Sequence, residues 1–299
     1  YGDHRDLHSF PTRRSSDLDL LEVYCEENSR LTEVASQLGL KARRFTRADG
    51  DLRTQEGRDA LWRLLVRERP RHVWMAPECG PWGNFSRLNM CRSSSTRDKI
   101  MSARAEQQKH LELCNEVYEF QIAEGGHFHI EQPQGSEVFE QPIMGNIVMG
   151  TLRTVFDMCE VGKLKVPKGN NYLRKRSVVR TTSRELHESL DARYCNKRHN
   201  HQQIEGKIRY LGKWINLSEY AARYSNGFAK NVAWFLLRSV GCGELPLETA
   251  ELCIESNDQS QAEILAAASD NKSRRKSLQQ LETVKPQKNE IWENTHKTP

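Results

Sequence analysis

The sequence predicts an α/β protein built on a doubly wound, mostly parallel β-sheet. Apolar segments of strand length alternate with segments of helical periodicity over residues 20–159, which is typical of parallel strands joined by helical crossovers. Two of the apolar segments, Val73–Met75 and Phe128–Ile130, run directly into polar loops. Ligands collect beyond the carboxyl ends of strands in such sheets, so these loops are the first candidates for a functional site.

The expected elements alternate regularly through the first half of the chain. Strands are predicted at residues 20–24, 41–45, 72–75, 128–130 and 153–159. Helices are predicted at residues 29–39, 55–69 and 98–123 and within 136–152. Pro70 ends the second helix and the Gly125–Gly126 pair ends the third, because neither residue type favours continuation of a helix.

The pattern changes after Gly162 to a basic sequence rich in turns. A strand is predicted at residues 173–181, and two closing helices follow, one capped by Ser218 and one at Phe228–Leu237. Residues 239–299 are rich in Gln, Ser, Asn and charge, so we expect a mostly disordered tail with at most one short helix near 248–268.

The first eighteen residues are expected not to belong to the protein. Tyr1–Leu18 can be back-translated in frame into a common sequencing-adapter oligonucleotide, so the segment resembles a translated adapter. We expect residues 1–18 to be a disordered artefact, and the true N-terminus is then undefined.

Charge and cysteine content limit the classes of partner. Residues 163–238 contain 17 Lys and Arg against 5 Asp and Glu, whereas residues 19–162 contain 18 against 22. The basic segment predicts a nucleic-acid surface, with a solvated Lys-rich face as the alternative. The eight cysteines form no CxxC pair, which favours free thiols and an intracellular protein of the nucleus or cytoplasm. No apolar run approaches the roughly 20 residues of a membrane helix, so no membrane partner is expected.

Cys79 and Glu131 are the candidate catalytic residues. They lie in WMAPECGPWGNFS and GGHFHIEQPQG, and a thiol with an acid that can hold a ring is what covalent attack on a pyrimidine needs. In this order the motifs resemble the DNA (cytosine-5) methyltransferase family, in which a Pro-Cys loop supplies the nucleophile and a Glu-Asn-(Val/Pro) loop supplies the ring-binding acid. The chain departs from that pattern at Glu78, which replaces the proline before the cysteine and is expected to raise the pKa of the thiol.

The resemblance implies a Rossmann-like, S-adenosylmethionine-dependent methyltransferase sheet in residues 19–162 and a small basic target region in 163–238. It also implies methyl transfer to carbon 5 of cytosine, in DNA rather than RNA, through a covalent Cys79 adduct. Candidate cofactor-binding residues are Glu22, Asn28, Ser29, Asp49, Asp51 and Pro77. Arg174, Arg176 and Arg180 fall on one face of the predicted strand at 173–181, where they could hold the base or a phosphate, or simply face solvent.

Other functions stay open at this point. Glu26 and Glu27 stand where the family has small residues, which favours a catalytically inactive nucleic-acid-binding module, for example in a mobile element. His127, His129 and Glu131 alternate on one side of a strand and could form the metal site of a hydrolase. Cys195, His199 and His201 are weak zinc candidates, because a fourth ligand would have to come from Cys159 or another distant residue.

Overall fold

The fold is known from a computed structural model, which describes residues 18–167 and 169–240 of the chain. The predicted tail after residue 240, with its short helix, and residues 1–17 of the adapter-like segment lie outside the described residues. Leu18 belongs to that segment by sequence, yet it is buried, and its carbonyl accepts a hydrogen bond from the Arg71 N–H (2.9 Å). The described domain therefore includes Leu18, one residue before the expected boundary.

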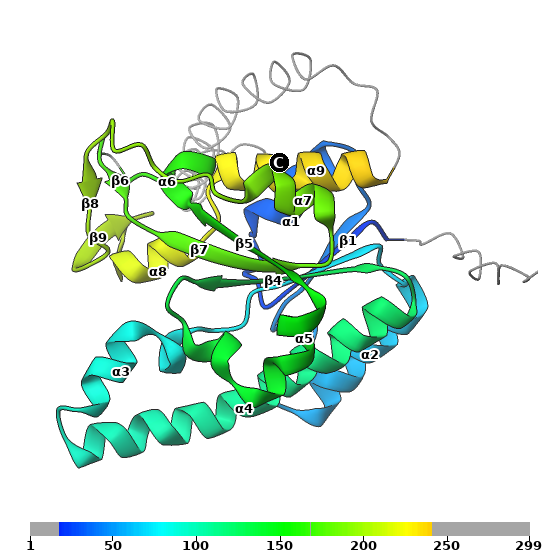
Figure 1. Cartoon of the computed structure of the whole chain (residues 1–299), viewed down its shortest axis with the longest axis horizontal. Helices are drawn as coiled ribbons and strands as arrows, with labels where there is room; N and C mark the ends of the chain where they lie inside the picture. The colour runs from blue at the N-terminus through cyan, green and yellow to red at the C-terminus, as the bar shows by residue number, and fades with distance from the viewer. Residues whose placement is uncertain (1–17, 168, 241–299) are drawn as a thin grey trace, which may run out of the picture. The chain divides into compact units, whose positions relative to one another are not determined.

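Six strands form one mixed sheet at the centre of the described domain (Figure 1). The strands are β1 Leu20–Val23, β2 Ala42–Phe45, β3 His72–Met75, β4 His127–Pro133, β5 Leu152–Asp157 and β7 Arg176–Thr181. Their order is β2-β1-β3-β4-β7-β5, and only β7 runs antiparallel to its neighbours. The expected mostly parallel α/β sheet is confirmed, and it is compatible with a Rossmann-like fold. The antiparallel strand between β4 and β5 is a feature that the sequence pattern did not predict.

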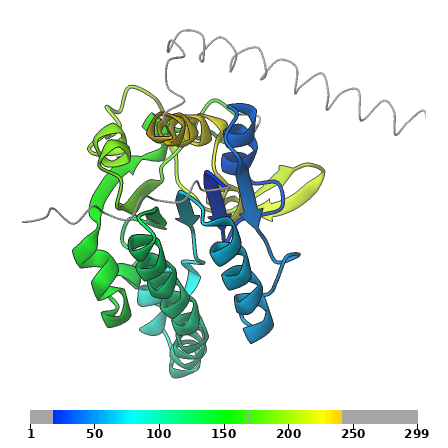
Figure 2. The same ribbon diagram turned by 90° about the vertical axis from the view of Figure 1, so that its right-hand side faces the viewer.

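Helices cover both faces of the sheet (Figures 1 and 2). One face carries α1 Arg30–Gln37, α7 Arg184–Leu190 and α9 Asn226–Ser239. The other face carries α2 Gln55–Glu68, α4 Ser94–Ala123 and α5 Gly145–Gly150. None of the described helices is both long enough and apolar enough to cross a membrane.

Each face of the sheet has its own apolar core, because side chains alternate along every strand. In β3, Trp74 packs on the α1–α9 face, while Val73 and Met75 pack on the α2–α4 face. Trp74 is fully buried, and its indole N–H donates to the Tyr224 hydroxyl (2.8 Å). Full burial of one apolar side chain such as Phe128 contributes roughly 1.5–3 kcal/mol, so two such cores hold the strand ends firmly in place.

The direction of winding reverses between β1 and β3. The chain crosses from β1 through α1 to β2 on one side, and then returns through α2 to β3 on the other side of β1. Loops that leave the carboxyl ends of β1 and β3 therefore part in opposite directions, and such a switch point is where open α/β sheets bind ligands. The loop after β1 begins at Tyr24, which has a left-handed backbone (φ 60°), and the loop after β3 contains Cys79.

The segment after Gly162 adds short elements to the side of the sheet. β6 Tyr172–Leu173 pairs with β8 His201–Gln202, and β9 Lys207–Tyr210 forms a hairpin with β10 Lys213–Asn216 before α8 Leu217–Ala222. We call β6, β8, β9, β10 and residues 191–200 the basic lobe. The strand predicted at 173–181 is wrong in one respect, because it breaks at residues 174–175 between β6 and β7.

The region predicted to hold a helix within 136–152 is less regular than expected. Two 3₁₀ turns, Glu137–Glu140 and Pro142–Met144, precede the short α5. Pro142 has no N–H to continue the first turn, so the chain restarts rather than forming one long helix. A four-residue helix, α6 Met158–Val161, follows β5 directly.

Candidate active site

The Cys79 loop begins where β3 ends, at the sheet edge beside the switch point. Pro77 is buried, Cys79 is half-buried, and the loop continues as a 3₁₀ turn over Gly80–Trp82. Trp82 is itself buried in the core on the α2–α4 face and anchors this turn. The thiol is therefore held on a shaped loop and is not part of a packed core.

Glu131 lies within β4, directly across from Val179 of β7. Its side chain is only 6% exposed, and its Oε1 atom accepts no hydrogen bond. Lys175 Nζ lies 3.8 Å from that oxygen and forms an ion pair with it. Because a buried carboxylate oxygen without a hydrogen bond is costly, this atom is available to a proton donor on a ligand.

Gln132 joins the loops that follow β3 and β4. It is buried, and its amide donates from Nε2 to the carbonyl of Pro77 (2.7 Å). Its Oε1 accepts a hydrogen bond from the Ser136 hydroxyl (2.9 Å). The neighbour of Glu131 in sequence thus fixes the position of the loop that carries Cys79.

A second connection between the two loops comes from α4. The Arg104 guanidinium donates to the carbonyl of Pro81 (3.0 Å) and forms a hydrogen-bonded ion pair with Glu137. It also stacks over the Trp82 ring, 4.7 Å from the ring centroid. A guanidinium suits this position because its planar array of donors can serve a carbonyl and a carboxylate at once.

The Cys79 thiol follows β3, Glu131 lies in the neighbouring β4, and the charge of Glu131 acts on the pKa of the thiol. Burial raises the pKa of the Cys79 thiol, and the negative charge of Glu131 raises it further. The ammonium of Lys175 lowers the pKa of the same thiol, and Glu78 has a smaller raising effect. At neutral pH the thiol is therefore mainly protonated, and Lys175 is the charge that favours its thiolate.

Lys175 is the site residue that sequence reasoning missed. It lies in the break between β6 and β7, and its ammonium donates to the Ala221 carbonyl (3.2 Å) while it pairs with Glu131. The available signal was its position between two arginines, since strand alternation sends Lys175 to the opposite face from Arg174 and Arg176.

Arg176 and Arg180 lie on one side of β7, whereas Arg174 lies outside that strand, so the three arginines predicted to share a face do not form one row. Arg176 makes a bidentate ion pair with Asp157 (2.7 and 2.9 Å). Arg180 donates to the carbonyls of Val148 and Thr151 at the end of α5, and burial lowers its pKa. Arg174 and Arg176 are exposed, and Arg180 is half-buried.

The first three predicted cofactor residues, Glu22, Asn28 and Ser29, stabilise the turn after β1 or lie on its surface. Glu22 is buried at the end of β1 and accepts hydrogen bonds from the Ser29 hydroxyl (2.6 Å) and from the N–H and hydroxyl of Thr32 (3.1 and 2.5 Å). Burial raises the pKa of Glu22, and these hydrogen bonds lower it in part. Asn28 is exposed in the turn. The N-terminus of α1 is thus satisfied by a side chain of the protein itself.

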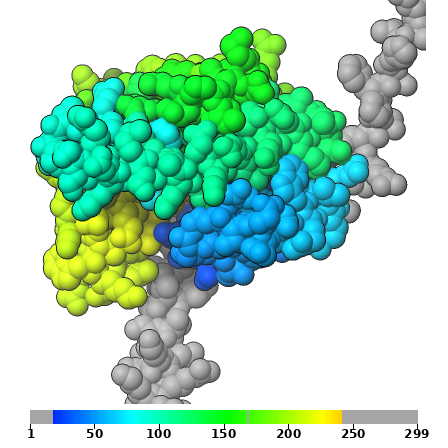
Figure 3. Space-filling view, turned by 90° about the horizontal axis from the view of Figure 1, so that it is seen from below, coloured from blue at the N-terminus to red at the C-terminus, as the bar shows by residue number. Residues whose placement is uncertain are grey.

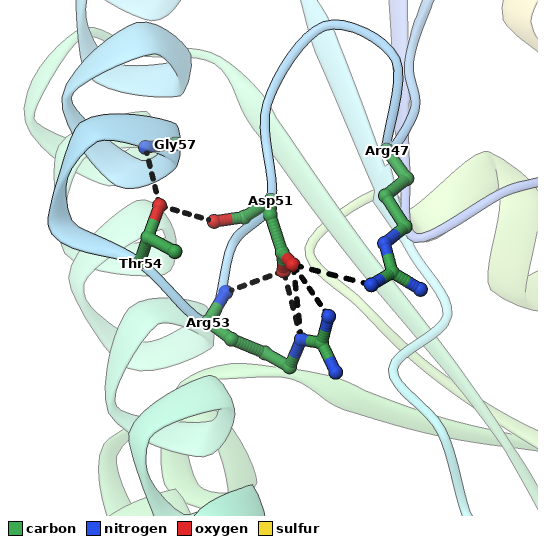
Figure 4. Close-up of polar contacts among 5 residues, drawn as sticks. All are labelled: Arg47, Asp51, Arg53, Thr54 and Gly57. Carbon is green, nitrogen blue, oxygen red and sulfur yellow. Dashed lines mark hydrogen bonds and ion pairs between the residues drawn. The ribbon is translucent and has the colours of Figure 1, made fainter.

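Asp49 and Asp51 both shape the turn after β2, and Figure 4 shows the contacts of Asp51. Asp49 accepts hydrogen bonds from the N–H and hydroxyl of Thr46 (2.9 and 3.1 Å). Asp51 is held by Arg53, whose hydrogen bonds keep the pKa of this carboxyl well below its usual range, and it also pairs with Arg47. Both aspartates therefore hold the turn through bonds within the protein.

A pocket of about 280 Å³ opens beside this turn, at the carboxyl ends of β1 and β2. We call it the β1–β2 pocket; it is lined by Tyr24, Cys25, Phe45, Thr46, Arg47, Gly50, Asp51, Leu52, Arg53, Glu78, Gln107 and His110. Figure 3 shows the α2–α4 face of the domain, with part of the basic lobe, in yellow, at its edge. Of the predicted cofactor residues, only Asp51 lines the pocket; Pro77 is buried nearby, where its carbonyl serves Gln132. Glu78 connects the pocket to the adjacent Cys79.

The histidines of β4 are not arranged as a metal site with Glu131. His129 is fully buried and is hydrogen-bonded through Nδ1 to the Thr181 hydroxyl (2.7 Å) and through Nε2 to His72 (3.0 Å). Burial lowers the pKa of His129 well below its ordinary value. In the part of the chain that the structure describes, one group has metal-ligand geometry, and it consists of Cys159, Cys195, His199 and His201.

The site that emerges has two adjoining parts. Cys79, Glu131 and Lys175 form a reactive centre at the ends of β3 and β4, and the β1–β2 pocket lies next to it across Glu78. A thiol, a buried acceptor and a balancing cation are suited to covalent chemistry on a ring that can donate hydrogen bonds. The sequence matches no protein-family model and no curated protein.

Proposed function

We propose that the chain transfers a methyl group to carbon 5 of cytosine in DNA, through a covalent adduct at Cys79. The observation that carries this proposal is the buried Glu131 Oε1, which lacks a hydrogen bond and lies near a thiol on a neighbouring loop. A cytosine ring offers what this oxygen lacks, because its exocyclic amine is a hydrogen-bond donor and its N3 becomes one once it has taken up a proton. Contact through these atoms would leave carbon 6 open to the thiolate.

The proposed reaction begins when N3 takes up a proton from solvent and donates a hydrogen bond to Glu131, while the Cys79 thiolate adds to carbon 6. The electron pair displaced to carbon 5 makes that carbon nucleophilic, and carbon 5 would take a methyl group from a sulfonium donor, which would leave as a neutral thioether. Loss of the proton on carbon 5 then restores the ring double bond and expels Cys79 as a thiolate, and N3 returns its proton to solvent. The net change replaces one C–H bond by a C–CH₃ bond and releases one proton.

Lys175 has a supporting role in this scheme. Its ammonium lowers the pKa of Cys79 and balances the charge of Glu131 before the ring binds. Because Lys175 is tethered to the Ala221 carbonyl, its position is fixed by α8. It is a positioning residue that makes the thiolate easier to form.

S-adenosylmethionine would supply the electrophilic methyl group, and the β1–β2 pocket has the chemistry to hold it. Phe45 and Leu52 offer apolar contact for a purine, and the carboxylates of Asp51 and Glu78 can accept hydrogen bonds from hydroxyl or ammonium groups. Exposed Glu26 and Glu27 occupy the turn after β1 in place of small residues. We therefore assign the cofactor to the pocket and not to that turn.

The DNA target would be bound by the basic lobe, with the cytosine extruded from the duplex to reach Cys79. The β9–β10 hairpin carries Lys207, Arg209 and Lys213 and exposes Leu211 and Trp214. Cations that contact phosphates, combined with exposed apolar side chains that can stack on bases, suit an opened duplex. A lobe this small can read few base edges, so we expect weak sequence preference.

Two assays on the full chain test the proposal. Methyl transfer from labelled S-adenosylmethionine to cytosine-containing DNA should occur, should be lost in Cys79→Ser and should persist in Cys91→Ser, which removes an exposed thiol. DNA that contains 5-fluorocytosine should form a stable adduct with the Cys79 thiol, because fluorine cannot leave carbon 5 as a cation. Absence of transfer to DNA, with no adduct, would remove the proposal.

A second candidate is a nucleic-acid-binding module that has lost catalysis. Two observations favour it. The pKa of the Cys79 thiol is raised. The Glu22 carboxylate closes the turn after β1 by accepting a hydrogen bond from the Thr32 N–H of α1. Calorimetry with S-adenosylmethionine separates the two candidates, since a binding module should show DNA binding without any heat from the cofactor.

A further inference from the structure

We propose that Cys159, Cys195, His199 and His201 bind a structural zinc ion. Their ligand atoms, two sulfurs and two ring nitrogens, all lie within 4.8 Å of one another. We call this group the Cys159–His201 cluster. It lies apart from Cys79 and Glu131, and its assignment does not depend on the proposed function.

The distances within the cluster match the edges of a zinc tetrahedron. Zn–S bonds of about 2.3 Å and Zn–N bonds of about 2.0–2.1 Å imply ligand–ligand separations of about 3.3–3.8 Å. Cys195 Sγ lies 3.4 Å from His199 Nε2 and 3.5 Å from His201 Nε2. Cys159 Sγ lies 3.3 Å from His201 Nε2, and the two Nε2 atoms are 3.0 Å apart. These four of the six separations lie within a few tenths of an ångström of the tetrahedron edges, and the other two are no longer than 4.8 Å.

The four ligands come from three segments of the chain. Cys159 belongs to α6, His201 belongs to β8, and Cys195 and His199 belong to the loop between α7 and β8. Residues 191–200 have no helix or strand, and Leu190 is the last buried apolar side chain before them. A polar loop without its own core needs a cross-link to hold one conformation, which is what structural zinc provides.

Groups around the cluster support the ligands. The Lys197 N–H points to Cys195 Sγ (3.3 Å), and Lys197 has a left-handed backbone (φ 62°) that allows this. The Cys195 N–H donates to the Asp157 carboxylate (2.9 Å). The Tyr172 ring packs against the His199 ring, with centroids 3.9 Å apart. N–H groups directed at a sulfur favour its thiolate, and packing of this kind fixes the orientation of an imidazole.

The ligand set selects the metal and its role. Two thiolates with two imidazoles in a tetrahedron are typical of Zn²⁺, and four protein ligands leave no open position for catalysis. The site is therefore structural. The zinc ion would hold β8 against β6. The Arg174 N–H, which directly follows β6 and precedes Lys175, donates to the Gln202 carbonyl of β8 (3.2 Å).

Metal analysis of the purified full chain tests this inference. We expect about one zinc ion per chain in the wild type and in Cys91→Ser, and loss of most of the zinc in Cys195→Ser and His201→Asn. Cobalt in place of zinc should give the visible absorption of a tetrahedral ion with sulfur-to-cobalt charge transfer. His199→Cys keeps four ligands, so it should retain the metal and show stronger charge transfer from its third thiolate.

Three results would overturn the inference. The first is a folded wild-type chain that binds neither zinc nor cobalt under reducing conditions. The second is a mass lower by two hydrogens in the metal-free protein, with Cys159 and Cys195 linked as a disulfide. The third is unchanged zinc content in both Cys195→Ser and His201→Asn. Circular dichroism of each variant separates loss of ligation from loss of the fold.

Discussion

The Cys79–Glu131 centre and the Cys159–His201 cluster hold reactive side chains by different means. Glu131 is part of a central strand, and Gln132 and Arg104 tie its loop to that of Cys79. The cluster instead joins loop segments through its own side chains. The sheet can therefore form the first site before any ligand binds, whereas the second site orders its surroundings only when a metal is present. Changes at the sheet edge should then act on chemistry or on the whole domain, and changes at the cluster should act locally.

The largest expected effect comes from Glu131→Gln. The glutamine amide carries no negative charge, and one of the two carboxylate oxygens is replaced by an NH₂ group that donates instead of accepting. Methyl transfer should therefore fall by about 10²–10³-fold. Measurement of kcat/KM with cytosine-containing DNA, beside the exposed Glu140→Gln as a control, gives the loss. Equal activity in the two variants would show that Glu131 has a structural role and not a catalytic one.

Glu22→Ala should have the next largest effect, and it should act on the whole domain. The change leaves the N–H and hydroxyl of buried Thr32 without their acceptor at the centre of the sheet, which costs about 2–3 kcal/mol of unfolding free energy. Urea denaturation measures this loss. The control is Glu33→Ala, which removes a surface ion pair with Arg30 on the same helix and should change stability by less than about 0.5 kcal/mol. Similar losses in the two variants would contradict the buried role of Glu22.

The pH dependence of Cys79 gives a smaller effect. Burial and Glu131 raise the pKa of the thiol, so below that pKa the thiolate fraction should rise about tenfold per pH unit. Alkylation of Cys79 by iodoacetamide, followed by mass spectrometry between pH 7 and 9, measures this rise without any assumption about function. Lys175→Met removes the charge that lowers the pKa and should slow alkylation at each pH, while Lys175→Arg should not. Faster alkylation in Lys175→Met would contradict the assigned electrostatics.

The smallest effect should be local opening of the basic lobe when the metal is removed. A chelator should accelerate tryptic cleavage after Lys197 and Arg198 by roughly three- to tenfold, while cleavage after Arg63 in α2 stays unchanged. Digestion time courses read by mass spectrometry report both sites at once. Equal acceleration at both sites would mean that the metal stabilises the whole domain, and the contrast between the two regions would then be lost.

The sequence predicted most of the sheet because its signals are local. Apolar runs such as Val73–Met75 and Phe128–Ile130 carry their own pattern, and both lie in strands whose ends meet. The antiparallel β7 has no comparable signal, because direction depends on which neighbours a strand pairs with and not on its own residues.

The site was predictable as far as strand ends determine it. Cys79 follows β3, and Glu131 lies near the end of the neighbouring β4, so their approach could be expected from topology. The ion pair of Arg176 with Asp157 and the approach of Cys159 to His201 join residues that are distant in the sequence. No periodicity reports such pairs. Alternation separates Lys175 from Arg174 and Arg176, but it does not indicate the ion pair of Lys175 with Glu131.

One tripeptide, residues 174–176, faces three different parts of the molecule. The Arg174 N–H bonds to Gln202 of the basic lobe, Lys175 pairs with Glu131, and Arg176 pairs with Asp157. Any attempt to exchange the lobe for one with another target preference would cut through this junction. A chimaera that keeps residues 174–176 and their three partners should preserve the reactive centre, whereas a graft placed a few residues further along the strand would disconnect it.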